Sequence, residues 1–457
     1  MALINQYDIK NNEWFSKLQG NILKGHGRDF TTNIFVKFQE NRLESVKEWI
    51  ADFATTKITS CKKQLKENEI YKRNKVSGGV FYGFMLSAHG YNYLEMKTTS
   101  FEKTFNDGME KAGLNDPEKK LWEEGFQNEI HAMILIGDDN QEKLAEASRI
   151  IIDELDLLGL ITTVEHGNAI RNENKDGLEH FGYVDGISQP LFFEDELEKY
   201  KELNANTNEF NPTAAKELVL VNDPLVKDKD AFGSYFVFRK LEQNVRKFKR
   251  NEEKLADVLK LEGDASERAG AMIVGRFEDG TPIEVSDEDG IIASGIFNNF
   301  KYSDNNSKCP FHAHIRKSNP RRNGDQKHIM ARRGIPYGQV VKPSTVKEDY
   351  HELPTKDVGL LFMSFQSSIT NQFEFIQKQW VNDENFPNNK NGIDPVIGQN
   401  NKGNISLGVF PLEYGETSPS NFTIAPFESA VTMKGGEYFF APSIPFLEGL
   451  FEKCQCL

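Results

Sequence analysis

The pattern of hydrophobic and polar positions in the first third of the chain predicts alternating strands and helices. Short segments rich in β-branched and aromatic residues predict strands at Thr31–Phe38, Gly79–Leu86, His131–Gly137 and Leu160–Val164. Segments with apolar residues on one helical face predict helices at Glu40–Thr55 and Asp139–Leu158. The order, two successive strand–helix–strand units, is that of a ferredoxin-like fold.

The second half of the chain carries a weaker version of this pattern. Strands are predicted at Gly233–Phe238 and Val358–Phe365, and helices at Gln243–Leu261 and Ile369–Trp380. The segment Asn204–Asp230 is predicted to be a linker or surface excursion, and Asn382–Asn391 a loop. We therefore expect an α+β protein of two related ferredoxin-like units, residues 1–200 and 201–457.

Composition places the chain among globular proteins and excludes some partners. Its 457 residues are too many for one simple core, and its hydrophobic and charged contents are 38% and 27%. The net charge of −14 argues against nucleic acid, which requires a basic surface. No apolar run is long enough to span a membrane. The polar N-terminus lacks a signal-peptide core, so a cytoplasmic location is expected, with export by another route left open.

Cysteine and phenylalanine usage add two weaker constraints. The cysteines at 61, 309, 454 and 456 form neither a disulfide framework nor a zinc-ligand pattern, which favours a reducing compartment. The 34 phenylalanines suit a flat apolar ligand, but they suit ordinary aromatic core packing equally.

The segment His180–Pro190 places one carboxylate, Asp185, among glycines and aromatic residues. Gly182 and Gly186 relieve backbone crowding, so the chain can lie against a bulky planar partner. The carboxylate is then either a helix N-cap or a group that handles protons. The segment alone leaves both interpretations open.

A second segment, Cys309–Arg321, contains His312 and His314. A zinc site would need further ligands at matching spacing, and none is nearby. One of the two as a single axial ligand to a haem iron fits better, although a structural histidine is also consistent with the sequence. The basic residues that follow could neutralise haem propionates or form a solvated turn.

A third segment, Ile329–Gly338, contains Arg332 followed by a turn. Arginine remains protonated at all relevant pH values and can stabilise developing negative charge in a dry site. An arginine held in a structural ion pair is the alternative.

Together these segments resemble the dye-decolorising peroxidase family, a group of haem peroxidases. The resemblance rests on Gly182-x-x-Asp185-Gly186, on the run from His314 to Lys317, and on RRGIPYG from Arg332. The N-terminal run Leu18–Gly27 and the run Gly359–Phe362 also match. The resemblance extends from about residue 18 to about 450, and the chain length indicates the longer subgroup.

The resemblance implies a dimeric α+β barrel-type fold with one non-covalent haem b held between sheet and helices. His314, rather than His312, would be the axial iron ligand, and Asp394 would hold its other ring nitrogen. Asp185 and Arg332 would be the catalytic pair on the distal face. The residues implied to contact the cofactor or line its pocket are His314, Arg316, Arg321, Leu360, Phe362, Gly186 and Ile187. Of these, Arg316 and Arg321 would face the propionates.

The implied activity is the reduction of hydrogen peroxide coupled to oxidation of a bulky phenolic or dye-like donor. Asp185 would move a proton between the peroxide oxygens, so an acidic pH optimum is expected. Leu360 and Phe362 would keep large donors out of the pocket. Electrons would then enter through surface relay residues, with Trp380 and Tyr337 as the candidates, unless these two only pack. Gly334 stands where some relatives have a polar side chain, which could change peroxide reactivity.

Other functions remain consistent with parts of this pattern. A haem-handling protein with little turnover would need neither Asp185 nor Arg332, so their presence favours the enzyme. A chlorite- or haem-processing relative with the same barrel is disfavoured by the Gly182–Gly186 motif. A zinc hydrolase using His312 and His314 is a more distant alternative. The oligomeric state, monomer or dimer, and the physiological donor do not follow from the sequence.

Overall fold

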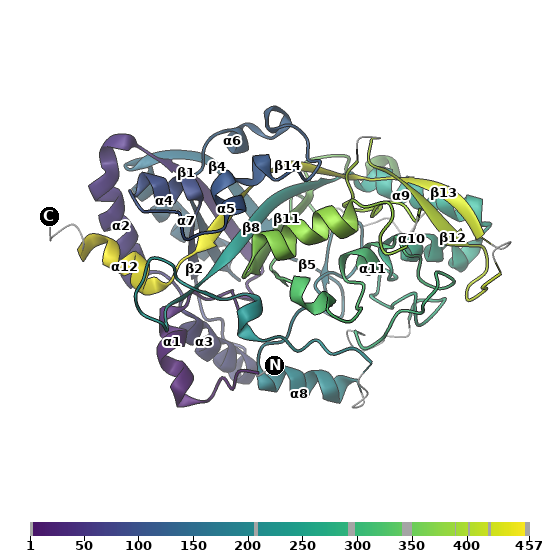
Figure 1. The fold of residues 1–457 in the computed structure, drawn as a ribbon, viewed down its shortest axis with the longest axis horizontal. Helices are drawn as coiled ribbons and strands as arrows, with labels where there is room; N and C mark the ends of the chain where they lie inside the picture. The colour runs from purple at the N-terminus through teal and green to yellow at the C-terminus, as the bar shows by residue number, and fades with distance from the viewer. Residues whose placement is uncertain are drawn as a thin grey trace.

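The computed structural model describes residues 3–204, 209–290, 298–340, 350–388, 390–400, 403–418 and 422–452 (Figure 1). The strands are β1 (Phe30–Phe38), β2 (Phe81–Leu86), β3 (Ala132–Asp138), β4 (Gly159–Asn168), β5 (Ile170–Arg171), β6 (Gly177–Leu178), β7 (Val221–Asn222), β8 (Phe232–Gln243), β9 (Ala331–Arg332), β10 (Ile335–Tyr337), β11 (Gly359–Gln366), β12 (Ile405–Pro411), β13 (Phe422–Glu428) and β14 (Val431–Ala441). The α-helices are α1 (Asn12–Lys17), α2 (Leu43–Thr56), α3 (Cys61–Asn74), α4 (Ala88–Tyr93), α5 (Lys103–Asp107), α6 (Glu124–Gln127), α7 (Gln141–Asp156), α8 (Glu194–Leu203), α9 (Val245–Leu259), α10 (Glu267–Val274), α11 (His314–Ser318) and α12 (Ile444–Glu452). Two π-helical segments are η9 (Ile369–Phe373) and η10 (Ile376–Val381), and a short 3-10 helix is η7 (Asp325–His328).

Ten strands form one antiparallel sheet whose central order is β10-β11-β8-β14-β2-β3-β1-β4. The order β2-β3-β1-β4 in one half matches β10-β11-β8-β14 in the other, and each is the ferredoxin-like order. The halves join where Phe440 of β14 pairs with Leu86 of β2. The expected fold of two ferredoxin-like units is therefore confirmed.

The sheet curves until its two edge strands approach each other. A Cβ atom on Gly167 of β4 would lie 2.5 Å from Cγ2 of Ile335 in β10, so only glycine permits this contact. In Figure 1, α2, α7 and α12 lie beside β1 and β2 on the left, and α9, α10 and the β12–β13 hairpin lie on the right. The hairpin and these helices form a second layer around the part of the chain that carries the site.

Aromatic packing builds the large hydrophobic core. The ring of Phe35 lies edge-on to Phe126 and Phe238, with centroid distances of 5.2 and 4.7 Å. This core takes buried side chains from both halves of the chain, and a smaller core gathers around α9 and α10. The division at residue 200 stays a prediction, and the large core does not separate there.

The expected strands and helices are present, with several differences. Strand β4 continues to Asn168 and β8 to Gln243, both well beyond their expected ends. The helix expected over 369–380 contains the π-helical segments η9 and η10. The segment 204–230 is not a surface excursion where it is described, because Phe210, Val219 and Leu220 are buried and β7 pairs with β8.

Two further sequence features can be placed. Among the described residues, no helix combines the length and apolar character needed to cross a membrane. Cys61 and Cys309 are buried free thiols, and burial raises the pKa of each to about 12. The C-terminal cysteines lie outside the described residues.

Candidate functional site

The three sequence motifs meet at one cavity, called here the central cavity, between the two hydrophobic cores. It encloses about 2000 Å³ that no protein atom occupies, part of it open to solvent. Of the site residues predicted from sequence, those that line it are Asp185, Gly186, Ile187, His314, Arg321, Arg332, Leu360 and Phe362. The fold thus brings together residues separated by up to 177 positions in the chain.

The glycine motif forms a tight turn after β6. Gly182 and Gly186 have φ values of +102° and +80°, which favour glycine at both positions. The amide of Asp185 donates to the carbonyl of Gly177 (2.9 Å), and its Oδ1 accepts from the amide of Gly186 (2.6 Å). The next helix begins at Glu194, so Asp185 does not cap a helix. Its exposed side chain instead lines the central cavity.

A half-buried carboxylate, Glu179, holds this turn in shape. It accepts hydrogen bonds from the amides of Phe181 and Tyr183 (2.9 and 3.0 Å) and from the side chain of Gln243 in β8. Burial raises the pKa of Glu179 to about 7, although these hydrogen bonds act in the opposite direction. Glu179 also lines the central cavity, and its position was not anticipated from sequence.

The raised pKa of Glu179 predicts a pH-dependent stability. The folded-state pKa of about 7 exceeds the ordinary value of 4.5, so between these pH values the folded protein binds more protons than the unfolded protein. The stabilisation that Glu179 contributes is therefore present below about pH 4.5 and is lost as pH rises through 7. We expect the free energy of unfolding of the haem-free protein to fall between pH 5 and 8 by up to about 3 kcal/mol more than in Glu179→Gln. Urea denaturation measures this, and parallel pH profiles would contradict it.

His314 is the first residue of α11 and points a ring nitrogen at a buried carboxylate. Its Nδ1 lies 2.8 Å from Oδ2 of Asp394, whose side chain is fully buried. Oδ1 of Asp394 accepts from the amides of Val396 and Ile397 (2.8 and 3.0 Å). Because an ionised carboxylate only accepts, Nδ1 carries the proton, and in the neutral imidazole Nε2 keeps its lone pair.

The charges around His314 favour its basic character. Burial alone would lower the pKa of His314, but the charge and hydrogen bond of Asp394 outweigh burial and raise it. Conversely, burial would raise the pKa of Asp394, and the charge of His314 lowers it below the ordinary value. Asp185 and Arg332 also act on the pKa of His314, in opposite directions. The carboxylate partner expected from sequence is therefore in contact with the expected histidine.

His312 does not belong to the same site. Its ring is fully buried edge-on to Phe410 (4.7 Å), and a Cβ atom on Gly408 would lie 2.2 Å from its Nε2. Burial lowers the pKa of His312 to about 3. In the described part of the chain, no group of three or more histidine, cysteine or acidic residues could hold a metal ion. A zinc site built on His312 and His314 has no support.

Arg332 lies in β9, which pairs with β11, and is held by residues that follow the glycine motif. Its amide donates to Oε1 of Gln189 (3.1 Å), and its Nη2 donates to the carbonyl of Ser188 (3.2 Å). The next residue, Arg333, is half-buried and donates to the carbonyls of Arg332, Asn21 and Ile22, at 2.8, 2.7 and 2.8 Å. Arg333 therefore fastens the Arg332 segment to the N-terminal run.

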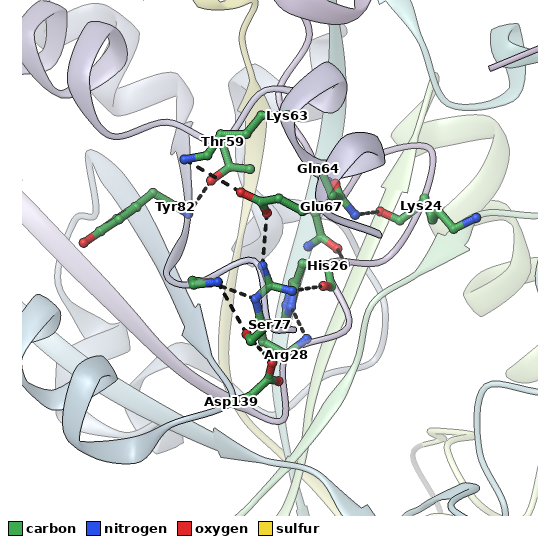
Figure 2. Close-up of polar contacts among 12 residues, drawn as sticks. Lys24, His26, Arg28, Thr59, Lys63, Gln64, Glu67, Ser77, Tyr82 and Asp139 are labelled. Carbon is green, nitrogen blue, oxygen red and sulfur yellow. Dashed lines mark hydrogen bonds and ion pairs between the residues drawn. The ribbon is translucent and has the colours of Figure 1, made fainter. Parts of the chain in front are cut away.

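The N-terminal run is itself a folded loop rather than a catalytic element. Figure 2 shows Gln64 of α3 reaching Lys24, and its Nε2 donates to the carbonyls of Lys24 and Gly25 (2.9 and 2.8 Å). Arg28 lies between Glu67 (3.1 Å) and the carbonyl of Gly79 (2.9 Å). These contacts hold the N-terminal run in place. Through Arg333, the run then supports Arg332, although the two segments are far apart in the sequence.

Arginines line the cavity, but they are not the pair expected from the sequence. Arg321 is present, sandwiched between Phe210 and Phe300, and its buried Nε has no hydrogen-bond partner among the described residues. Arg276 also lines the cavity and was missed; burial lowers its pKa to about 9. Its signal was a lone arginine two positions after the run 269–274.

Arg316 was expected at the propionates, and the structure contradicts this. Its guanidinium donates to the carbonyls of Ser303, Asn305 and Cys309 (2.6, 3.0 and 2.6 Å), and Arg316 does not line the cavity. All three contacts fix the loop that precedes α11. Arg316 thus supports the position of His314 and does not face the cavity.

This reassignment predicts a stability effect. Arg316→Met is expected to lower the free energy of unfolding by at least about 3 kcal/mol, because three carbonyls lose a buried charged donor. Arg322→Met is the control, since Arg322 is half exposed and its ion pair with Asp325 contributes at most about 1 kcal/mol. Chemical denaturation of both haem-free variants measures the difference. Equal stability of the two variants would contradict it.

The two proposed surface relay residues are not on the surface. Trp380 is 3% exposed and stacks on Phe386 (5.3 Å), and Tyr337 is 6% exposed with the Lys240 ammonium over its ring. Neither side chain can touch a bulky donor in this conformation. The expectation of surface sites at these positions is therefore wrong, and an internal relay role stays a prediction.

The chemistry of the lining fits a haem. The ring nitrogen of His314 that Asp394 does not engage could bind the iron, and Val274, Phe373 and Ile397 would provide apolar walls for a flat macrocycle. Arg276 and Arg321 line the cavity and can neutralise two acidic groups. A Cβ atom on Gly186 would meet nothing within 4 Å, so the turn leaves open space beside it.

Comparison with known proteins gives one consistent result. Residues 17–167 match the DyP dimeric alpha+beta barrel domain, and residues 203–391 match the C-terminal domain of Dyp-type peroxidases. The chain is 41% identical to the multifunctional dye peroxidase DyP2 of Amycolatopsis sp. over 450 residues, 95% of each protein. It is 32% identical to a dye-decolorizing peroxidase of Auricularia auricula-judae, covering 70% of this chain and 65% of that one. The crystal structure of a DyP-type peroxidase from Anabaena sp. superposes with a TM-score of 0.90 at 40% identity, over 98% and 97% of the two chains.

Proposed function

Because the chain belongs to the DyP-type peroxidase family of haem enzymes, we propose that its central cavity binds one non-covalent haem b through His314. The protein is thus a dye-decolorising-type peroxidase, as the sequence resemblance predicted. What the family does not specify is the role of each residue in this chain. The single observation that carries our assignment is that Asp185, Arg332 and the Asp394-bound His314 all line one cavity.

His314 would bind the iron through Nε2, since Nδ1 is engaged by Asp394. The partial negative charge that Asp394 imposes makes the imidazole a stronger donor and fixes the ring plane. Arg276 and Arg321 would neutralise the propionates, in place of Arg316. Leu360 and Phe362 would border the space available to hydrogen peroxide.

When bound, the haem supplies the iron and the electrons that cleave the O–O bond of hydrogen peroxide. Asp185 accepts a proton from one peroxide oxygen and delivers it to the other, so that water can leave. Its position in a glycine turn keeps the carboxylate exposed to the cavity, where it can make both contacts. Arg332 stabilises the negative charge that develops as the bond breaks. An acidic pH optimum, a monomer or dimer, and a cytoplasmic location stay predictions.

A haem-handling role without turnover would need the axial ligand and the cationic groups alone. It gives no reason for Gln189 and Ser188 to orient Arg332 toward the same cavity as Asp185. The peroxidase assignment explains why Asp185 and Arg332 line the same cavity, and the family relationship agrees with it.

Absorption spectroscopy tests the proposal. The purified protein, reconstituted with haem, is expected to show a Soret band at one haem per chain. Hydrogen peroxide should change that band within the mixing time, and a dye or phenol should restore it. Failure to bind haem would overturn the cofactor assignment, and a Soret band unaffected by peroxide would favour the haem-handling alternative.

A further inference from the structure

A second depression, called here the outer groove, lies on the protein surface behind the central cavity. It encloses about 1100 Å³ that no protein atom occupies, part of it open to solvent. Apolar side chains that include Pro190, Ala215, Leu218 and Ile329 line it, together with polar groups such as His328 and Asn371. An apolar floor with a few polar groups is the usual composition of a site for a small organic molecule.

The wall between the outer groove and the central cavity is one chain segment thick. Ile329 lines both spaces. Pro190 lines the groove and its neighbour Gln189 lines the cavity. Likewise, Gln372 lines the groove and its neighbour Phe373 lines the cavity. The wall is also fixed, because Nε2 of Gln372 donates to the carbonyl of Ile329 (2.7 Å). A molecule in the groove would therefore lie directly behind the cofactor cavity without entering it.

His328 lines the groove with 8% of its surface exposed, and its neighbours fix which tautomer its ring adopts. Nδ1 of His328 lies 2.5 Å from the carbonyl oxygen of Asn371, and a carbonyl can only accept. Nδ1 therefore carries the proton, and in the neutral imidazole Nε2 keeps its lone pair. No described residue forms a hydrogen bond with Nε2. The ring is held flat against Phe375, with a centroid distance of 3.7 Å and an interplanar angle of 3°.

We propose that the outer groove binds a neutral, phenol-sized aromatic donor, with His328 Nε2 as the acceptor of its hydroxyl proton. This rests on the peroxidase function proposed above, which supplies the oxidant. The O–H bond of the phenol breaks, the proton forms an N–H bond at His328, and one electron crosses the wall at Ile329 to the peroxide-oxidised enzyme. The product is a neutral phenoxyl radical, and two phenols are consumed for each peroxide.

The lining favours a neutral aromatic donor over a highly charged one. Glu217 and Lys327 contribute one charge of each sign to the groove, so neither an anion nor a cation is selected. The site also accounts for donors that Leu360 and Phe362 would exclude from the central cavity. Trp380 lies 5.4 Å from the His328 ring and offers a second electron path from the same groove.

Binding can be measured without turnover, because a phenol is not oxidised before peroxide is added. Titration of the ferric protein with 2,6-dimethoxyphenol should broaden the ligand proton signals in NMR through the nearby paramagnetic iron. The haem-free protein should bind the same phenol without this extra relaxation. Ala215→Trp, which fills the groove, should abolish the signal broadening in the ferric protein and the binding by the haem-free protein. Ala145→Trp, at an exposed position of α7, is the matched control. Unchanged binding in Ala215→Trp would overturn the groove assignment.

The role of His328 is tested with two donors that differ in one proton. His328→Gln is expected to lower the rate of 2,6-dimethoxyphenol oxidation about 100-fold and to remove its solvent isotope effect. Oxidation of 1,4-dimethoxybenzene, which has no hydroxyl proton, should keep its rate. An equal loss for both donors would overturn the proton-acceptor role.

The outcomes separate this proposal from the function on which it rests. If the unmodified protein fails to react with peroxide, the peroxidase assignment fails first. If the reaction with peroxide is normal and Ala215→Trp oxidises the phenol at the unmodified rate, the outer groove alone is refuted. Loss of phenol oxidation in Ala215→Trp with a normal peroxide reaction supports it.

Discussion

Asp185→Asn is expected to slow the reaction of the haem-loaded enzyme with hydrogen peroxide by about 10² to 10⁴-fold. Asparagine has the shape of aspartate, but its amide cannot accept a proton from peroxide and return it. The turn should keep its shape, since the Asp185 amide bonds to the carbonyl of Gly177 and the Oδ1 of asparagine can still accept from the Gly186 amide. Haem content and the resting spectrum should therefore stay unchanged. Stopped-flow absorbance of the Soret band under excess peroxide measures the rate constant.

A matched substitution separates the chemistry from a general charge effect. Asp153→Asn removes one exposed carboxylate from α7, far from the cavity lining, and should leave the rate unchanged. Arg332→Leu should also slow the reaction strongly, because the developing negative charge loses its cation. If Asp185→Asn reacts at the unmodified rate, Arg332 or a water molecule must move the proton.

The N-terminal unit could be predicted from sequence because its signals are local. Helix α7 places Leu144, Ile151 and Leu155 on one buried face, strand β1 is rich in β-branched and aromatic residues, and strand β3 is a short apolar run. Strand β14 was missed because its pattern is interrupted. A register shift occurs between Met433 and Gly435, where a Cβ atom would lie 2.2 Å from the Phe126 ring. Such a bulge is set by tertiary contact and leaves no periodic signal.

The candidate site shows the same division between local and tertiary information. Asp185 and Arg332 belong to short motifs that can be recognised in the sequence, and the glycines beside Asp185 already indicated an unusual turn. The orientation of an arginine depends on which acceptors the fold places around it. Arg316 faces three carbonyls of a loop without regular structure, and Arg276 faces the cavity. No sequence pattern distinguishes these two environments.

Burial of aromatic side chains was equally hard to anticipate. Trp380 was assigned to the surface by resemblance, but in this chain Phe386 covers one face of its ring and His328 approaches it edge-on. The Phe386 contact comes from a loop predicted correctly as a loop. Loop conformation, and hence what a loop covers, does not follow from its turn-forming residues.

The largest expected effect on the cofactor comes from His314→Ala, which should leave the protein unable to retain haem at one per chain. The only imidazole lining the central cavity in the described chain is that of His314, and His312 is packed against Phe410 with no opening to the cavity. Reconstitution followed by gel filtration and pyridine haemochrome assay measures retained haem. Added imidazole should restore part of the Soret band, since the alanine leaves space for it.

Substitution of Asp394, the carboxylate that contacts Nδ1 of His314, should cause a smaller loss of haem than His314→Ala. Asp394→Asn is expected to weaken haem binding by about 10 to 100-fold, because the neutral amide no longer stabilises the orientation and electron density of the imidazole. His89→Ala, at an exposed histidine, is the control and should retain haem fully. Retained histidine ligation of the haem in His314→Ala would move the assignment of the iron ligand to His312. That result would require the β12–β13 hairpin to shift, since Gly408 of β12 lies directly against the His312 ring.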